Sequence, residues 1–152
     1  MVKFGLNLFA ALASTAFLSI ATPSLASTPA KNEPAVYVVI DVSSQVMRVE
    51  VNGRRYSKWK VSTAGKGYHT PRGSYSVQRM AKEYYSQKYD MAPMPYSVFF
   101  NGGYAVHGSN HIKSLGRPAS HGCVRLRPKN AAKLFSLVQK HGARQTKIVI
   151  VN

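Results

Sequence analysis

The sequence predicts a mainly β fold with one α-helix packed near the C-terminus. Short β-branched and aromatic runs recur along the chain, and two pairs of runs are joined by Asn52-Gly53 and Asn101-Gly102. Asn-Gly between alternating apolar runs is a strong signal for a β-hairpin. Beyond residue 26, apolar residues recur convincingly at helical spacing only in residues 128–142. There is no internal repeat, so we expect one domain.

The first half of the domain is expected to begin with three antiparallel strands. Alternating residues predict these strands, and Asn52-Gly53 joins the second to the third. Three glycines and a proline make residues 64–73 a loop, and a fourth strand follows it. The expected strands cover residues 35–42, 45–51, 55–62 and 74–80.

The second half is expected to carry a histidine at the end of a strand. The expected elements are a long loop or lid over 81–95, a hairpin over 96–107, a helix over 128–142 and a strand over 146–151. Long connections without regular structure inside compact domains are often functional. The hairpin ends at His107, and Pro128 and Gly142 suit the two ends of the helix.

The first 26 residues have the pattern of a signal peptide. Lys3 is followed by an apolar stretch over residues 4–20, and Ser24-Leu25-Ala26 fits the small-x-small cleavage pattern. An uncleaved membrane anchor is the alternative, but the stretch is short for a span and contains three hydroxyl residues. We therefore expect export to the periplasm or envelope of a bacterium, a flexible lead over 27–34 and a soluble domain over 35–152.

The charge balance is strongly basic. The chain has 21 Lys and Arg against 5 Asp and Glu, a formal net charge of +16. Such a balance suggests an anionic partner: nucleic acid, a membrane surface or a polyanionic cell wall. Because the basic residues are spread along the chain and export is expected, we predict attraction to the envelope and no nucleic-acid partner.

Cys123 is the single cysteine of the chain, within Ser120-His121-Gly122-Cys123-Val124-Arg125-Leu126. It has no partner for an internal disulfide, so a special role must rest on its thiol. His107-Gly108 lies 16 positions upstream, and a histidine that takes the thiol proton generates the nucleophilic thiolate. This combination points to acyl transfer. The alternative is a buried structural cysteine on a strand.

Three other classes of protein compete with this interpretation. A metal site could use the ligands His107, His111, His121 and Cys123, but no Glu follows the first histidine as a metalloprotease helix requires. A papain-like peptidase usually has its cysteine before its histidine. A wall-binding module without activity explains the charge but leaves the cysteine and the histidines without a role.

Three parts of the chain resemble the YkuD-type L,D-transpeptidases. Residues 107–126, with their two His-Gly steps and the Cys123 motif, are similar to the family's catalytic segment. Residues 61–73 resemble its first-half signature, and 94–96 its middle segment. The resemblance covers nearly all of residues 35–152. It implies a β-sandwich with the helix packed on one side, and a peptidoglycan enzyme without a cofactor or metal.

The resemblance implies catalytic roles for the motif residues. Cys123 corresponds to the nucleophile and His107 to the general base, while the Gly108 carbonyl orients the imidazole in place of a triad carboxylate. Backbone N–H groups around Gly122 and Cys123 are expected to form the oxyanion hole, where losing one donor typically costs about 100- to 1000-fold in rate.

The resemblance also implies residues that contact the substrate or support the site. These are Ser120, His121, Arg125 and Tyr96. His121 either supports the site or contacts the substrate, and Arg125 either holds a substrate carboxylate or braces the loop.

The implied partners are the stem peptides of peptidoglycan, as acyl donor and acceptor. An envelope protein is an alternative acceptor, and transfer to water would make the chain an L,D-carboxypeptidase. The enzyme is expected to be a monomer and a carbapenem target.

Overall fold

The computed structural model describes Met1 and residues 33–152, so the predicted signal peptide and most of the flexible lead lie outside the described residues. The strands are β1 (Val36–Asp41), β2 (Val46–Val51), β3 (Arg54–Lys60), β4 (Gly73–Ser76), β5 (Arg79–Ala81), β6 (Tyr85–Ser86), β7 (Ala92–Pro93), β8 (Ser97–Asn101), β9 (Tyr104–Gly108), β10 (Val124–Leu126) and β11 (Thr146–Val151). The helices are α1 (Pro128–His141) and the 3₁₀ turns η1 (Gln87–Tyr89), η2 (Ile112–Ser114) and η3 (Ala143–Gln145).

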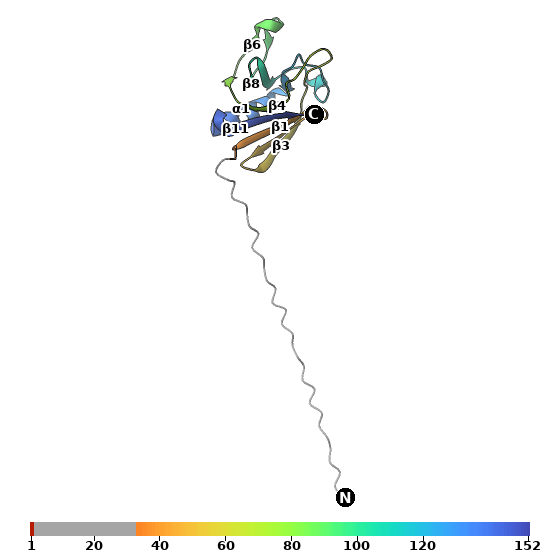
Figure 1. The fold of residues 1–152 in the computed structure, drawn as a ribbon, viewed down its shortest axis with the longest axis vertical. Coiled ribbons are helices and arrows are strands. Elements are labelled where there is room, and N and C mark those ends of the chain that lie inside the picture. Colours follow the sequence, from red (N-terminus) through yellow and green to blue (C-terminus); the bar gives the residue numbers. More distant parts are fainter. Residues whose placement is uncertain (2–32) are drawn as a thin grey trace.

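The first sheet has the strand order β3-β2-β1-β11-β4 and lies at one side of the domain (Figure 1). Its antiparallel β1–β2–β3 start confirms the prediction from the alternating runs. Asn52 and Gly53 turn the chain with φ of 50° and 72°, the left-handed conformation that this hairpin turn requires. β11 pairs in parallel with β1, so the last strand lies inside the sheet rather than at its edge.

The second sheet has the order β10-β9-β8-β5. The β8–β9 hairpin confirms the second predicted hairpin and carries His107 near its end. β10 pairs in parallel with β9 and was not predicted as a strand, because three residues are too few for a periodic signal.

The predicted strand over 74–80 is wrong in one respect, since the structure divides it between the two sheets. β4 pairs with β11 in the first sheet, and β5 pairs with β8 in the second. Val77 is buried between the two parts, and the Gln78 N–H bonds the Phe99 carbonyl, so the chain crosses the core here. The segment predicted as one strand therefore contributes a short strand to each of the two sheets.

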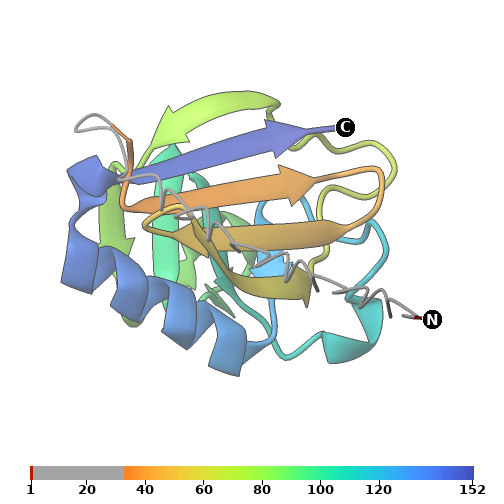
Figure 2. The same cartoon turned by 90° about the horizontal axis from the view of Figure 1, so that it is seen from below.

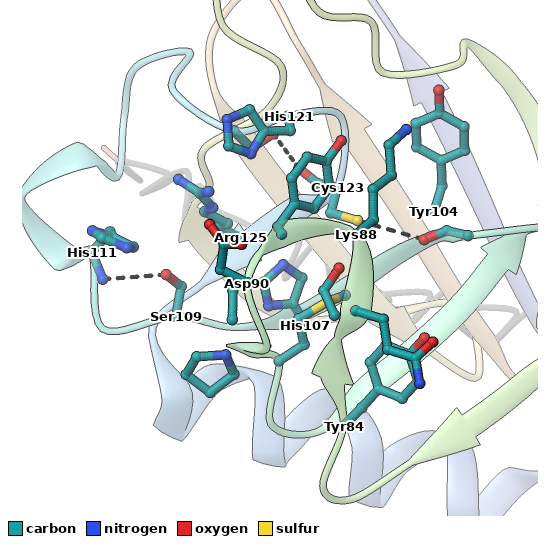
Figure 3. Close-up of a pocket in the computed structure, with 18 of the residues that line it drawn as sticks. Tyr84, Lys88, Asp90, Tyr104, His107, Ser109, His111, His121, Cys123 and Arg125 are labelled. Atoms are coloured by element: carbon teal, nitrogen blue, oxygen red, sulfur yellow. Dashed lines mark hydrogen bonds between the residues drawn. The ribbon is translucent and has the colours of Figure 1, made fainter.

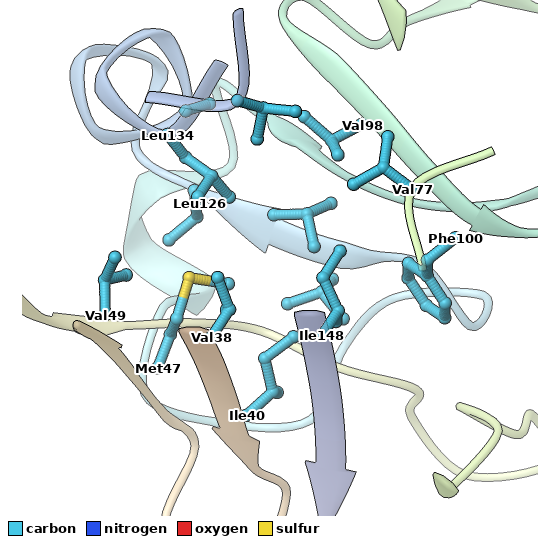
Figure 4. Packing of buried hydrophobic residues seen from close by; sticks show 14 of the residues in the cluster. Val38, Ile40, Met47, Val49, Val77, Val98, Phe100, Leu126, Leu134 and Ile148 are labelled. Atoms are coloured by element: carbon cyan, nitrogen blue, oxygen red, sulfur yellow. The ribbon is translucent and has the colours of Figure 1, made fainter. Parts of the chain in front are cut away.

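The core lies between the sheets, where side chains of both inner faces meet those of α1 (Figure 4). The predicted helix is confirmed, with Pro128 in its first turn and Gly142 after its end at a φ of 96°. α1 packs against β9, β8 and β1, along one margin of the sandwich (Figure 2). Its buried residues are Ala131, Leu134, Phe135 and Val138.

The segment over 81–95 was expected to be a loop or lid without strands, and we call its residues 82–95 the flap. The structure corrects the absence of strands, because β6 and β7 pair across the 3₁₀ turn η1. Two further backbone hydrogen bonds, from Met94 to Tyr84 and from Tyr96 to Lys82, extend the pairing. The flap lies at the end of the domain away from β3 (Figure 1). No helix in the described residues is both long and apolar enough to span a membrane.

Candidate active site

The register of β9 and β10 brings the predicted nucleophile and base to one face. Arg125 lies opposite His107, and Val124 lies opposite Val106. Alternate residues of a strand share a face, so Cys123 and Arg125 lie on the same side as His107. All three line one cavity, whereas Val124 and Val106 are buried in the core.

His107 is buried, with 6% of its surface exposed, and its ring is held by its own backbone. Nδ1 lies 2.8 Å from the Gly108 carbonyl oxygen, which can only accept, so Nδ1 carries the proton and Nε2 is the free acceptor. Burial lowers the pKa of His107 to about 4, the Arg125 charge lowers it further, and the bond to Gly108 opposes both. The imidazole is therefore neutral near pH 7.

Gly108 itself is fixed by close packing. Its N–H donates to the Pro95 carbonyl at 2.8 Å, and a Cβ at this position would lie 3.1 Å from Cα of Pro128 and 3.2 Å from Pro95. The expected role of Gly108 in orienting the imidazole is consistent with this geometry.

Cys123 comes immediately before β10 and is partly exposed to the cavity. Its thiol lies 3.7 Å from the Gly103 carbonyl oxygen, a weak hydrogen bond in which sulfur is the donor (Figure 3). Burial raises the pKa of the thiol, while a backbone hydrogen bond at Ala105 and the Arg125 charge lower it. The resting thiol is thus protonated, and a base must remove its proton during the reaction.

Arg125 is half-buried, and burial lowers the pKa of its guanidinium. It donates from Nη1 to the Ala119 carbonyl at 3.0 Å, and its backbone exchanges two hydrogen bonds with Ser62. The side chain therefore braces the loop and also faces the cavity, so both roles expected for it are compatible with its position.

Ser120 closes the turn that presents the nucleophile. Its Oγ accepts from the Gly122 N–H at 3.0 Å and donates to the Cys123 carbonyl at 2.6 Å. The Gly122 N–H, expected to bind an oxyanion, is thus engaged in the resting structure and would have to exchange this bond. Gly122 has a φ of 129°, and a Cβ there would lie 2.6 Å from the Tyr104 ring, so only glycine fits.

Buried polar residues beneath this turn were not singled out by the sequence analysis. Thr70 Oγ1 donates to the Gly122 carbonyl at 2.8 Å and accepts from the Ala64 N–H at 3.0 Å. Gln45 bonds both the hydroxyl and the N–H of Thr63, whose carbonyl accepts from the Ser120 N–H. The segment resembling the first-half signature therefore supports the nucleophile loop. That resemblance was the one available signal for Thr70; Gln45 had none.

His121 is exposed and lies between two tyrosine rings. Tyr89 of the flap stacks on it with centroids 4.5 Å apart and planes 18° apart, and Tyr68 meets it edge-on, also at 4.5 Å. The residue beside the nucleophile turn therefore joins the flap to the loop over 64–73.

The cavity has a volume of about 810 Å³, which is large enough for a peptide segment. Five of the expected site residues line it: Cys123, His107, His121, Ser120 and Arg125. The flap adds charged residues of both signs, Lys88 and Asp90 (Figure 3). No sequence signal beyond the expectation of a functional lid pointed to these two.

Tyr96 lies elsewhere than expected for a substrate contact. Its ring packs edge-on against Phe135 of α1, with centroids 5.9 Å apart, and it is not among the described residues that line the cavity. Its φ of 55° turns the chain between the flap and β8. Tyr96 therefore supports the hairpin that carries His107.

The metal alternative was also compared with the geometry. Within residues 33–152, no three or more His, Cys, Asp or Glu side chains come together as a ligand set for a metal ion. The histidines of the alternative differ in setting, since His107 is buried and bonded to its own backbone while His111 and His121 are exposed.

The chain belongs to the YkuD family, described as the L,D-transpeptidase catalytic domain, and the family match covers residues 35–150. This match confirms the resemblance found in the motifs. No curated protein sequence matches the chain.

Solved structures of L,D-transpeptidases have the same fold. An enzyme from Stackebrandtia nassauensis is 26% identical with a TM-score of 0.67, and the match covers 81% of this chain and 57% of that one. One from Xylanimonas cellulosilytica is 28% identical with a TM-score of 0.62, covering 80% and 63%. The L,D-transpeptidase LdtMt1 in complex with imipenem is 24% identical with a TM-score of 0.69, covering 77% and 59%. The predicted sandwich is confirmed, and the chain spans less than two thirds of these relatives.

Proposed function

We propose that this chain is an exported, cysteine-dependent L,D-transpeptidase of bacterial peptidoglycan. Its substrate would be a stem tetrapeptide, cleaved after the L-centre of residue 3 with release of D-alanine. The observation that carries this proposal is the shared face of β9 and β10, which directs a protonated thiol and a neutral imidazole into one cavity.

The first step forms the thioester precursor. Nε2 of His107 takes the Cys123 proton as sulfur attacks the carbonyl carbon, and the carbonyl electrons move to oxygen. Backbone N–H groups at Gly122 and Cys123 would stabilise this oxyanion once the bond from Gly122 to Ser120 has exchanged. Because the imidazole becomes charged, the Gly108 carbonyl bound at Nδ1 stabilises the cation that forms.

The second step releases D-alanine. The imidazolium gives its proton to the nitrogen of the leaving amine, the C–N bond breaks, and the acyl group stays on sulfur as a thioester. Arg125 and Lys88 give this cavity positive charge that suits the carboxylate of the departing residue.

In the third step a neutral acceptor attacks the thioester carbon while His107 takes its proton, the C–S bond breaks, and the imidazolium returns that proton to the Cys123 sulfur. Asp90 is the one acid among the described residues that line the cavity, and its carboxylate favours a cationic amine there. This supports an amine of a second stem peptide, giving a 3→3 cross-link, or an amine of an envelope protein. Water would give carboxypeptidation.

The purified full chain tests this proposal with two substrates. Mass spectrometry should show release of D-alanine from a stem tetrapeptide and a covalent imipenem adduct at Cys123. The matched Cys123→Ser and Cys123→Ala variants should fold normally and give neither product at a comparable rate. D-alanine release by Cys123→Ala at the wild-type rate would overturn the cysteine mechanism. A folded wild type that releases no D-alanine would overturn the substrate assignment.

A further inference from the structure

The first sheet carries basic side chains on the face that points away from the core. We call this set the basic face: Arg48, Arg55, Lys58, Lys60 and Lys147. None of these residues takes part in the steps proposed above. Four of the five lie on β2 and β3, at one edge of the sheet. In Figure 2 this sheet, with β1, β11 and β3, lies in front.

The strand registers establish that these side chains share one face. On β2, Met47 and Val49 point into the core, being 0% and 1% exposed, so Arg48 points outward. Lys58 lies directly opposite Arg48, and Lys60 lies opposite Val46, two residues along the same face. The three side chains therefore form a compact basic group on the outside of the sheet.

This group is unfavourable for the isolated fold. Like charges directly opposite each other on neighbouring strands are destabilising, and Arg48 and Lys58 are such a pair. Of the two acids on this face, Glu50 lies opposite Arg55, and the Asp41 carboxylate accepts from Ser43 and Ser44 at 2.7 and 3.0 Å. The centre of the group is thus left with excess positive charge that an anionic partner would neutralise.

The neighbours of the basic face are apolar and aromatic. Val39 and Val149 lie in the same cross-strand row as Arg48 and are partly exposed. Tyr37, on β1, is partly exposed and lies between Lys147 of β11 and Glu50 of β2 in the next row of this face. Tyrosine favours positions where one end of the ring is apolar and the other is wet.

We propose that the basic face binds the surface of a bilayer rich in anionic phospholipids. The surface is an open sheet face with basic, apolar and aromatic residues side by side, which fits a broad interface of phosphate headgroups and acyl-chain edges. It lies on the sheet opposite the one that carries the nucleophile, so the cavity of a bound molecule stays open to a substrate on the other side. This binding does not depend on acyl transfer.

Vesicle co-sedimentation of the full chain at low salt tests the proposal. The vesicles contain phosphatidylcholine with or without about one quarter phosphatidylglycerol, and wild type should bind only the anionic ones. The variant R48Q/K58Q/K60Q should bind them about 100-fold more weakly, since each basic residue near such a surface contributes a factor of about five. The control K129Q/K133Q/K140Q removes the same charge from exposed positions on α1 and should lose less than about tenfold.

Three outcomes would overturn the proposal. Equal losses in the two triple variants would show that total charge, and not this face, drives binding. Wild type that binds a soluble polyphosphate or nucleic acid but not anionic vesicles would make a linear polyanion the partner. Wild type that binds neither would leave the face without a phosphate ligand. Thermal unfolding checks the fold, and if the triple variant unfolds, K58Q compared with K133Q replaces it, with an expected loss of about fivefold.

Discussion

The turn that presents the nucleophile and the flap that covers it are held in different ways. The turn is fixed by buried hydroxyl groups, with Ser120 and Thr70 bonded to its backbone at 2.6 to 3.0 Å. The flap exposes Tyr85 and Met91 by 52% and 57%, and it meets the turn through stacked rings, a contact worth about 0.5–1.5 kcal/mol. The turn that carries Cys123 is thus held by buried hydrogen bonds, whereas the flap is held over the cavity by weaker contacts between aromatic rings.

The largest effect should come from His107 in the fixed region. His107→Ala removes the base, and because the thiol is protonated at rest we expect acylation by imipenem at pH 7 to slow by about 100-fold or more. The control His111→Ala changes an exposed histidine at the cavity rim and should stay within about threefold. Acylation by His107→Ala at the rate of the control would mean that another group takes the proton.

The same histidine should make the fixed region sensitive to acid. Its pKa is about 4 in the folded chain and about 6.5 when unfolded. The unfolded state therefore binds the proton more readily, and stability falls as the pH drops from about 6.5 towards 4. Between pH 7 and about pH 4.5, urea unfolding should show about 2.5 kcal/mol more loss for wild type than for His107→Asn. Parallel losses in the two proteins would contradict a neutral, buried His107.

A smaller effect is expected from the hydroxyl beneath the turn. Thr70→Val keeps the shape but leaves the Gly122 carbonyl and the Ala64 N–H without a partner, which should reduce the free energy of unfolding by about 1–3 kcal/mol. It should also slow acylation, because the turn that carries Cys123 loses its support. Thr70→Ser retains the hydroxyl and should recover most of both losses. A Thr70→Val variant with wild-type stability and rate would remove this threonine from the support of the turn.

The smallest effect should come from the weakly held region. His121→Ala removes the ring on which Tyr89 stacks, so we expect the KM for the tetrapeptide to rise by about 2- to 10-fold while kcat changes little. His121→Phe restores a ring and should bring KM back towards the wild-type value. A fall in kcat that phenylalanine does not rescue would indicate that His121 acts in the chemistry, and the contrast between the two regions would then be wrong.

Much of the fold followed from local signals in the sequence. Both Asn-Gly turns mark real hairpins, and Pro128 and Gly142 mark the ends of α1, because turn and cap conformations are decided by a few adjacent residues. The division of the run around Val77 between two sheets was not foreseen. The pairing of a strand depends on segments far away in the sequence, and the local alternation of apolar and polar residues carries no information about them.

The site was predictable to a similar degree. Cys123 and His107 carry reactive groups in a recognisable motif, and the structure brings both to the same cavity. The support from Gln45 had no signal in the sequence, and Thr70 had only its place in the segment that resembles the first-half signature, since a buried hydrogen bond depends on which backbone atoms the fold brings near. Tyr96 was assigned to the substrate by its place in a similar segment, but its ring faces α1.

The position of β11 inside the first sheet has a consequence for how the domain forms. β1 pairs with β11 from Val36↔Thr146 to Asp41↔Val151, so a central pairing joins segments more than a hundred residues apart. Contacts of such long range are slow to form, because the entropy of closing a long loop must be overcome before they can stabilise anything. The central pairing of the first sheet can therefore form only after β11 has been synthesised, so β1 waits for its parallel partner while the residues between them are translated.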